Sequence, residues 1–300
     1  MKVFAVILVS LLMLNVAFAA ESKTLKKIKD SGVITMGVRE SSGALSYTLG
    51  NNKYVGYHVE ICEKVLATIQ KNLGLKKLEI KYVPVTSQNR MPLIQNGTID
   101  IECGSTTNNI ARAKDVSFAV TTFVEEIRIA VKASSGITDI AGLNKKTIAT
   151  TTGTTTVQTL RKNKKATGLE FKELYGKDHS DAFLLLESGR ADAFIMDGTI
   201  LAGNIARAKN PADFKIVGDV LSVEPIAIML PKDDAEFKKA VDEPIKAMMK
   251  SGEIAKLWDK WFLKPIPPTN TKVNMPANEN TKAAWATPNE KPMEEYTVKN

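Results

Sequence analysis

Apolar residues recur along the chain with two different spacings, and the alternation of these spacings predicts an α/β fold. Between residues 59 and 73 the apolar positions lie three or four residues apart, as on the buried face of a helix about four turns long: Val59, Cys62, Val65, Leu66, Ile69 and Leu73. Apolar or alternating runs at residues 33–38 and 78–85 are typical of strands. Strand, helix and strand in this order indicate a parallel α/β sheet.

The same alternation continues to residue 262 and then stops. Further strands are expected at residues 99–101, 127–131, 146–150, 169–174, 191–196, 214–217 and 225–230. Further helices are expected at residues 182–187, 198–208, 234–249 and 254–262. From Lys264 the chain is rich in proline and asparagine, which predicts an extended tail on the surface rather than another domain.

The stretch from residue 85 to residue 109 places polar side chains at the ends of two predicted strands. Ser87 is expected to cap a helix that begins with Gln88, and Gly97 to end it in a left-handed conformation. Arg90 then lies in the first helical turn, beside unpaired backbone N–H groups and the positive end of the helix dipole. An arginine fork in this position favours a carboxylate ligand.

Other polar residues follow the predicted strands in the same way. Because ligands bind at the carboxyl edge of open α/β sheets, we expect these residues to line one site: Arg39, Ser87, Arg90, Ser105, Thr107, Thr154, Thr155, His179 and Asp197. Taken singly, each also has a structural explanation: a surface salt bridge with Glu40 for Arg39, helix capping for His179 and Asp197, and turning of the chain for Ser105 and Thr107.

The charges of this set predict the class of ligand. Two arginines and one aspartate complement two carboxylates and one ammonium, which is the charge pattern of glutamate or aspartate. Each arginine can hold a carboxylate through two parallel hydrogen bonds, and serine and threonine hydroxyls can satisfy the remaining oxygens. A site withdrawn from water requires a partner for every charge, so this match in number favours ligand binding.

The first twenty residues have the features of a secretory signal peptide. Lys2 is followed by an apolar run from Val3 to Leu14 and by Ala17-Phe18-Ala19, a small-x-small cleavage site. The run is too short for a membrane-spanning helix, and the cleavage site has no nearby cysteine for a lipid anchor. We therefore expect residues 1–20 to be removed and the mature protein to be soluble and periplasmic.

Composition excludes several other classes of function. The formal charge of +8 does not indicate nucleic acid as a partner, because the lysines are spread among acidic residues and the protein is expected to be exported. Two cysteines without C-x-x-C spacing and two histidines give no zinc signature, so no metal is expected. No cofactor is expected, since the sequence lacks a dinucleotide fingerprint and the loop at 151–156 lacks the Gly-Lys-Ser/Thr ending of a phosphate loop. The sequence contains no Gly-x-Ser-x-Gly elbow, so this motif does not support catalysis by a serine nucleophile.

The sequence does not decide whether the two cysteines, Cys62 and Cys103, pair, although it favours two buried thiols. The periplasm permits a disulfide. However, Cys62 falls on the apolar face of the predicted helix and Cys103 lies near a strand end, and burial alone accounts for both positions.

A repeat with a shift of 92 residues relates two parts of the chain. Gly97 and Asp100 correspond to Gly189 and Asp192, so that each glycine ends a predicted helix and each aspartate lies in the following strand. We interpret the repeat as two α/β lobes of related plan. Gly-x-x-Asp is also a common way to leave a helix, so the match has a local explanation as well.

The order of the elements predicts where the lobes divide. Lobe 1 is expected to comprise residues 21–126 and 223–300, with a C-terminal tail at 265–300, and lobe 2 residues 127–222. The chain crosses between the lobes near residues 125–126 and 223–224, and the two crossings form a hinge. A cleft between lobes that can close is a binding device.

Several long blocks resemble one known family: GVRESS at 37–42, TSQNR at 86–90, QNGTIDIECGSTTNN at 95–109, GTTT at 153–156, KDH at 177–179, LESGRADAFIMD at 186–197 and WFLKPIPP at 261–268. The family is that of the extracellular solute-binding proteins of amino-acid ABC transporters, and the resemblance is closest to members that bind glutamate and aspartate. It implies the two-lobe periplasmic-binding-protein fold (type II), with lobes joined by two crossing strands. It also implies a non-catalytic protein that carries L-glutamate or L-aspartate to an inner-membrane ABC permease. We further expect a monomer.

The resemblance also assigns the candidate residues to parts of an amino-acid ligand. It implies that the α-carboxylate is held by Arg90, Thr107 and the Thr155 backbone, the α-ammonium by Asp197 and Ser105, and the side-chain carboxylate by Arg39, Ser87 and His179. Thr154 lies in the same loop as Thr155.

Two alternatives remain open from the sequence. The protein can bind another polar amino acid, glutamine or a basic one, or it can be a periplasmic dehydratase of prephenate-like acids on the same scaffold. Such an enzyme needs a general acid near the leaving group. In our interpretation every polar group already has a ligand charge to satisfy, which favours a binding protein.

Overall fold

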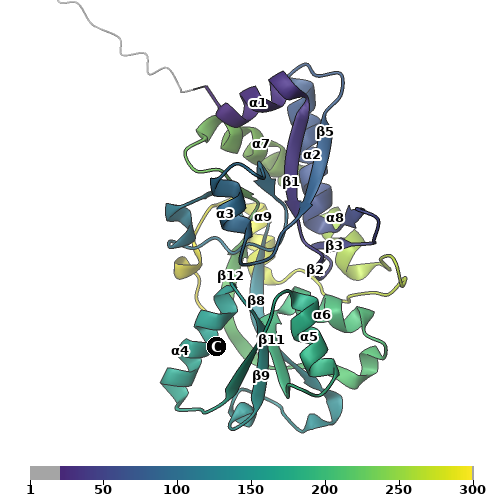
Figure 1. Cartoon of the computed structure of the whole chain (residues 1–300), viewed down its shortest axis with the longest axis vertical. Coiled ribbons are helices and arrows are strands. Elements are labelled where there is room, and N and C mark those ends of the chain that lie inside the picture. The colour runs from purple at the N-terminus through teal and green to yellow at the C-terminus, as the bar shows by residue number, and fades with distance from the viewer. Residues whose placement is uncertain (1–20, 299–300) are drawn as a thin grey trace, which may run out of the picture.

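Strand β1 (Val33–Val38) forms as expected in the computed structural model, which describes residues 21–298 (Figure 1). It belongs to the first of two large sheets, composed in spatial order of β5 (Glu79–Pro84), β1, β6 (Ile101–Glu102), β13 (Met229–Leu230) and β7 (Ser117–Phe118). β5 and β6 run parallel to β1, whereas β13 is antiparallel to its neighbours. The predicted signal peptide lies outside the described residues. No helix within 21–298 is both long and apolar enough to cross a membrane.

Helices on either side of this sheet complete the first lobe. They are α1 (Lys23–Ser31), α2 (Tyr57–Asn72), α3 (Arg90–Gln95), α7 (Ala235–Ser251) and α8 (Glu253–Trp258), which continues as a π-helical turn, η5 (Asp259–Leu263). The apolar face predicted for α2 is buried except for its last position, which is partly exposed. A small antiparallel sheet precedes α2 and consists of β2 (Ser41–Ser42), β3 (Ser46–Thr48) and β4 (Tyr54–Val55).

The second lobe contains the other large sheet, in the lower half of Figure 1. In spatial order its strands are β10 (Lys172–Gly176), β9 (Thr147–Thr151), β11 (Ala193–Asp197), β8 (Phe123–Lys132) and β12 (Phe214–Ile226). Helices α4 (Thr155–Thr167), α5 (His179–Glu187) and α6 (Gly198–Arg207) cover it. Short helical turns lie at η1 (Arg112–Lys114), η2 (Ala133–Ser135), η3 (Ala141–Leu143) and η4 (Pro211–Asp213).

The predicted repeat corresponds to the same local structure in both lobes. Gly97 and Gly189 both have φ near 74°, in the left-handed region that favours glycine, and each follows a helix. Asp100 then accepts a hydrogen bond from the backbone N–H of Thr35 (2.9 Å), and Asp192 accepts one from Thr147 (2.8 Å). The two lobes are therefore built on a related plan, as the sequence predicted.

The two strands β8 and β12 pass from one lobe to the other and pair with each other antiparallel (Figure 1). The predicted boundaries at 126/127 and 222/223 fall on neighbouring registered pairs, Glu126 with Val223 and Ile127 with Ser222. The two-lobe architecture with two crossing strands is confirmed, and the boundaries themselves stay a prediction.

Cys62 and Cys103 form a disulfide, the alternative that the sequence left open but disfavoured. The bond connects α2 to the residue that follows β6. His58 of α2 also contacts this loop, because its Nδ1 donates to the carbonyl oxygen of Gly104. Both cysteines are buried, as expected, and the loop that leads to Ser105 and Thr107 is thereby fixed to a long helix.

Two local predictions were wrong. Helix α3 begins at Arg90 rather than Gln88, because residues 86–89 form a turn in which Thr86 and Asn89 exchange side-chain to backbone hydrogen bonds. The C-terminal tail is not simply extended, since it contains α9 (Glu279–Ala286) and the turn η6 (Met293–Glu295).

The C-terminal tail packs against the beginning of the crossing strand β8. Trp285 Nε1 donates to the carbonyl oxygen of Thr122 (2.6 Å), and Asn278 Nδ2 donates to that of Val124 (2.9 Å). The hydroxyl of Thr281 contacts both the N–H and the carbonyl oxygen of Val124. The tail therefore supports one of the two connections between the lobes.

We expect loss of the disulfide to lower the free energy of unfolding by about 4 kcal/mol. The reason is that the bond closes a loop with a sequence separation of 41 residues and so restricts the unfolded chain. Urea unfolding of the wild type with and without reductant, and of the Cys62→Ala/Cys103→Ala variant, measures this. Reductant should leave the double variant unchanged, and an unchanged wild-type midpoint would contradict the expectation.

Candidate ligand-binding site

The predicted site residues gather where the two lobes meet. Arg39 follows β1 in the first lobe, while His179 begins α5 and Asp197 ends β11 in the second. All of the predicted residues except Thr154 are at most 6% exposed: Arg39, Ser87, Arg90, Ser105, Thr107, Thr155, His179 and Asp197. The sheet edges of both lobes therefore contribute to one desolvated region.

Arg39 is completely buried and pairs with a residue of the opposite lobe. Its Nη2 donates to Asp178 Oδ1 (2.6 Å), and its Nη1 donates to Ser105 Oγ (3.3 Å). Burial would raise the pKa of the Asp178 carboxyl, but the charge of Arg39 and the hydrogen bonds from Ser41 and Arg39 act together with its other neighbours to keep this pKa below its usual value. A surface salt bridge with Glu40, the structural explanation considered from sequence, is not what the structure shows. The contribution of Asp178 was missed, although it is the residue before His179.

His179 is a neutral hydrogen-bonding residue in this site. Its Nε2 lies 3.2 Å from Arg39 Nη2, which can only donate, so Nε2 accepts. Nδ1 then carries the hydrogen and donates to Thr151 Oγ1 (2.9 Å). Burial and the nearby charge of Arg39 lower the pKa of the imidazole to about 3. The ring is uncharged at neutral pH and its orientation is fixed from both sides.

Arg90 lies close to two other arginines. Its Nη1 donates to the carbonyl oxygen of Ser105 (3.0 Å). Burial, and to a smaller extent the charges of Arg112 and Arg39, lower the pKa of Arg90 to about 9, so the group remains protonated at neutral pH. The three guanidinium groups therefore form a cluster of positive charge.

Arg112 was missed by the sequence reasoning. It donates from Nη1 to the carbonyl oxygen of Thr107 (3.0 Å) in lobe 1 and from Nη2 to that of Gly153 (3.4 Å) in lobe 2. A usable signal was present, because Arg112 follows Ser105 and Thr107 in the loop that leaves β6. Placing it at the site requires knowledge that this loop turns back toward the second lobe.

Asp197 is a buried acid at the end of β11. It occupies the position before α6, but its side chain makes no capping hydrogen bond there, so the capping explanation fails. Burial raises the pKa of Asp197 well above its ordinary value, and the carboxylates of Glu125 and Glu224 act in the same direction. A cationic group beside these acids would relieve their repulsion.

The crossing strands contribute two glutamates that sequence reasoning assigned only to the hinge. Glu224 accepts hydrogen bonds from the hydroxyls of Thr107 (2.7 Å) and Thr155 (2.6 Å). Glu125 accepts one from the hydroxyl of Thr199, and burial raises its pKa to about 7. The hydroxyl hydrogens of Thr107 and Thr155 are therefore directed toward protein oxygens.

Among the predicted site residues, three buried polar atoms have no hydrogen-bond partner within residues 21–298: Arg39 Nε, Ser87 Oγ and Arg90 Nε. Such atoms are costly unless a ligand or water completes them. Thr154 differs, since its hydroxyl donates to the carbonyl oxygen of Thr151 (2.8 Å) in its own turn.

Gly153 shows how closely the lobes approach at this point. Its φ is +79°, and a Cβ atom on it would lie 2.8 Å from the Cα of Gln88. The loop before α4 is therefore packed directly against the turn that carries Ser87, which only glycine permits.

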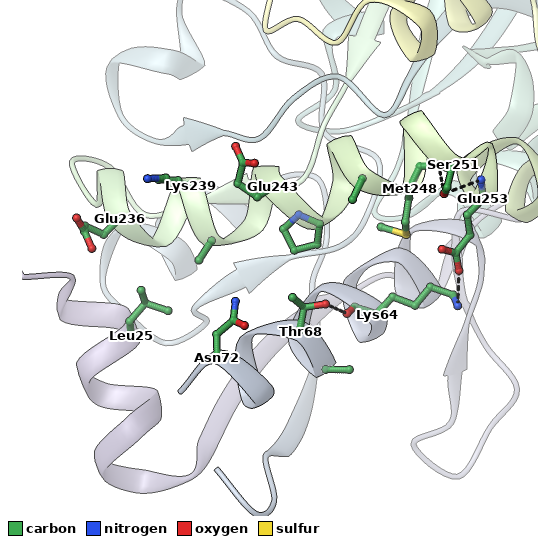
Figure 2. A pocket seen from close by; sticks show the side chains of 14 residues that line it. Leu25, Lys64, Thr68, Asn72, Glu236, Lys239, Glu243, Met248, Ser251 and Glu253 are labelled. Carbon is green, nitrogen blue, oxygen red and sulfur yellow. Dashed lines mark hydrogen bonds and ion pairs between the residues drawn. The ribbon is translucent and has the colours of Figure 1, made fainter. Parts of the chain in front are cut away.

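A surface groove lies in the first lobe, away from the predicted site, between α1, α2 and α7 (Figure 2). Its volume is about 890 Å³. Its charged side chains are of both signs and face solvent. For example, Lys64 Nζ lies 2.8 Å from Glu253 Oε1, and these two side chains are 41% and 43% exposed. The groove has none of the desolvated charges that distinguish the region between the lobes.

Comparison with known proteins gives a consistent result. The family model described as bacterial extracellular solute-binding proteins, family 3, matches residues 34–264. The glutamate/aspartate import solute-binding protein of Escherichia coli is 44% identical over 275 residues, which cover 92% of this chain and 91% of that protein. The L-glutamate/L-aspartate-binding protein of Pseudomonas aeruginosa is 43% identical over 274 residues, covering 91% and 90%.

Solved structures show the same architecture. The solute receptor for L-cysteine of Neisseria gonorrhoeae has a TM-score of 0.70 at 28% identity and covers 80% of this chain and 93% of that chain. The ancestral amino acid-binding protein AncCDT-1, described as a precursor of cyclohexadienyl dehydratase, has a TM-score of 0.68 at 27% identity, with coverage of 79% and 99%.

Neither His58 nor His179 should protonate between pH 5 and pH 8 in the folded protein. Burial lowers their pKa values to about 4 and about 3, while an unfolded histidine titrates near pH 6.5. The unfolded chain therefore binds more protons below pH 6.5, so the contribution of these rings to stability is complete above that pH and is lost as the pH falls toward 4. NMR titration of the two imidazole resonances measures this. A resonance that titrates near pH 6.5 would place its ring in water.

Proposed function

Because the chain belongs to the bacterial extracellular solute-binding proteins of family 3, we propose that it captures L-glutamate or L-aspartate between its lobes and delivers it to an ABC permease of the inner membrane. It acts as a periplasmic monomer with no nucleic acid partner. The similar proteins of Escherichia coli and Pseudomonas aeruginosa are named for these two amino acids.

The observation that carries this proposal is the cluster of two buried arginines, Arg39 and Arg90, and the half-buried Arg112, close to one buried aspartate. Arg112, Arg90 and Arg39 supply donors for two carboxylates, and Asp197 supplies the partner for one ammonium. The unpartnered Nε atoms of Arg39 and Arg90 and the Ser87 hydroxyl are suited to carboxylate oxygens. An acidic α-amino acid satisfies both signs of charge at once.

The contacts favour one orientation of the ligand. Arg112 touches both Thr107 and the loop that opens α4, which are the parts assigned to the α-carboxylate, so Arg112 shares that task. Backbone N–H groups at the first turn of α4 add to it. Arg39 and Ser87 bind the side-chain carboxylate, and His179, whose two ring nitrogens are already hydrogen-bonded to Arg39 and Thr151, holds Arg39 in position there. Arg90 binds the α-carboxylate, as the resemblance implies. Asp197 and Ser105 hold the ammonium.

The protein is proposed to be a carrier rather than an enzyme. A dehydratase on this scaffold needs a general acid with a pKa near the working pH, and Glu125 has a pKa of about 7. However, its two carboxylate oxygens already accept hydrogen bonds from Thr199 and from the backbone N–H of Glu126. Asp197, the other buried acid with a raised pKa, is assigned to the ligand ammonium, so neither of these two acids is left for a leaving group.

Isothermal titration should show L-glutamate or L-aspartate binding at least about thirtyfold more tightly than L-glutamine or L-arginine. A neutral or basic side chain leaves buried guanidinium groups without a carboxylate, which costs about 2–5 kcal/mol. L-Glutamine binding as tightly as L-glutamate would contradict the proposal. Conversion of prephenate by the protein would also overturn it.

The variants Arg39→Ala and Arg112→Ala should differ in which ligands they weaken. Arg112→Ala should weaken L-glutamate and L-glutamine alike, because both carry an α-carboxylate. Arg39→Ala should weaken L-glutamate by about 2–5 kcal/mol and L-glutamine much less, because only glutamate then has an unpaired buried carboxylate. Titration calorimetry with both ligands measures the difference.

Asp178 supplies the control for Arg39. Arg39→Ala also leaves Asp178 without its partner, and the double variant Arg39→Ala/Asp178→Asn removes that second charge. The preferential loss of L-glutamate should persist in the double variant. Equal losses for both ligands would make Arg39 a structural residue.

A further inference from the structure

We propose that Glu224 is a positioning residue that holds the two lobes closed over the ligand and fixes the direction of two threonine hydroxyls. This inference rests on the proposed function, since it concerns the same site. The inference extends the proposed function by assigning a task to a hinge residue that does not touch the ligand.

Glu224 lies on the crossing strand β12, opposite Glu125 of β8, and is completely buried. One oxygen, Oε2, accepts both the Thr107 hydroxyl (2.7 Å) and the Thr155 hydroxyl (2.6 Å). The other oxygen, Oε1, accepts the hydroxyl of Ser222 (2.9 Å) on the same strand. Three short, charge-assisted hydrogen bonds therefore converge on one side chain.

The two threonines come from different lobes. Thr107 follows β6 and is bridged to Ile226, whereas Thr155 is the first residue of α4. Glu224 itself lies on the connection between the lobes. The shared oxygen can accept both hydroxyls only when the lobes are together, so opening the cleft removes a hydrogen bond to a carboxylate. This contact favours the closed form.

Glu224 also determines what the hydroxyls can offer to a ligand. Each threonine hydroxyl has a single hydrogen, and in both cases that hydrogen points to Oε2. The hydroxyl oxygens can then only accept, which suits an ammonium and not a carboxylate. The ligand carboxylate must take its hydrogens from guanidinium and backbone N–H groups. Glu224 thereby directs the α-ammonium toward the hinge side of the cleft.

The surrounding charges are compatible with this role. Burial lowers the pKa of Arg112, and nearby carboxylates act in the opposite direction. The charge of Glu224 has the largest such effect. Its charge also adds to the repulsion that raises the pKa of Asp197. A ligand ammonium placed beside Asp197 and the two hydroxyls relieves that repulsion.

The test compares Glu224→Gln with Ser222→Ala. The amide is of nearly the same size but has one acceptor oxygen, so it cannot reproduce the carboxylate's set of hydrogen bonds. We expect Glu224→Gln to weaken L-glutamate about tenfold or more, through a faster dissociation rate with little change in the association rate. Ser222→Ala removes a bond to the same carboxylate from the same strand, and should change affinity less than about twofold. The unfolding midpoint of the ligand-free Glu224→Gln variant should not fall.

Two further measurements separate positioning from a general structural defect. Thr155→Val should weaken binding in the wild type but add little in the Glu224→Gln background. Glutarate, which lacks the ammonium, should be weakened by Glu224→Gln less than L-glutamate, because it loses only the contribution of Glu224 to closure. Additive losses, a slower association rate alone, or an equal loss for glutarate would each overturn the inference.

The outcome is independent of which amino acid is preferred. If the wild type binds L-glutamine and not L-glutamate, the proposed function fails, and the same variants are scored with L-glutamine. Glu224 acts on the ammonium that all α-amino acids share, so the expected losses are the same.

Discussion

The pairing of charges that are withdrawn from water is the constraint on which this molecule depends. Arg39, Arg90 and Asp197 are at most 4% exposed, and each would be strongly unfavourable alone. Arg39 finds a partner in Asp178 only because the other lobe brings it within 2.6 Å. The same requirement supports the proposed ligand, since two carboxylates and one ammonium would complete the charges that protein groups leave uncompensated.

The scaffold holds these charges at the ends of rigid elements. Arg39 and Asp197 stand at strand ends, and His179 and Thr155 begin helices, so their positions follow from the backbone. The disulfide fixes the loop after β6 to α2, and the C-terminal tail supports β8 near the crossing. The two strands that connect the lobes are β8 and β12, which pair with each other. A site divided between two such bodies is complete only when they close.

Hydrogen-bond direction adds selectivity that charge alone does not provide. The guanidinium groups can only donate, and the neutral His179 ring accepts from Arg39. That end of the site therefore offers hydrogen-bond donors to a ligand. At the hinge, Glu224 takes the hydrogens of two threonine hydroxyls and leaves their oxygens as acceptors. The two ends of the cleft thus differ in what they offer.

The sequence by itself determined the α/β lobes, their related plan and most of the strand-end residues, because hydrophobic spacing and glycine positions are local properties of the chain. Only the tertiary structure decided the pairs that join distant segments: Arg39 with Asp178, Arg112 between Thr107 and Gly153, Glu224 with Thr107 and Thr155, and Cys62 with Cys103. Each depends on a distance between residues far apart in sequence, which periodicity does not encode. Nothing in the sequence around Arg112 marks it as a residue that contacts both lobes. Its role follows from the loop that carries it to the opposite lobe.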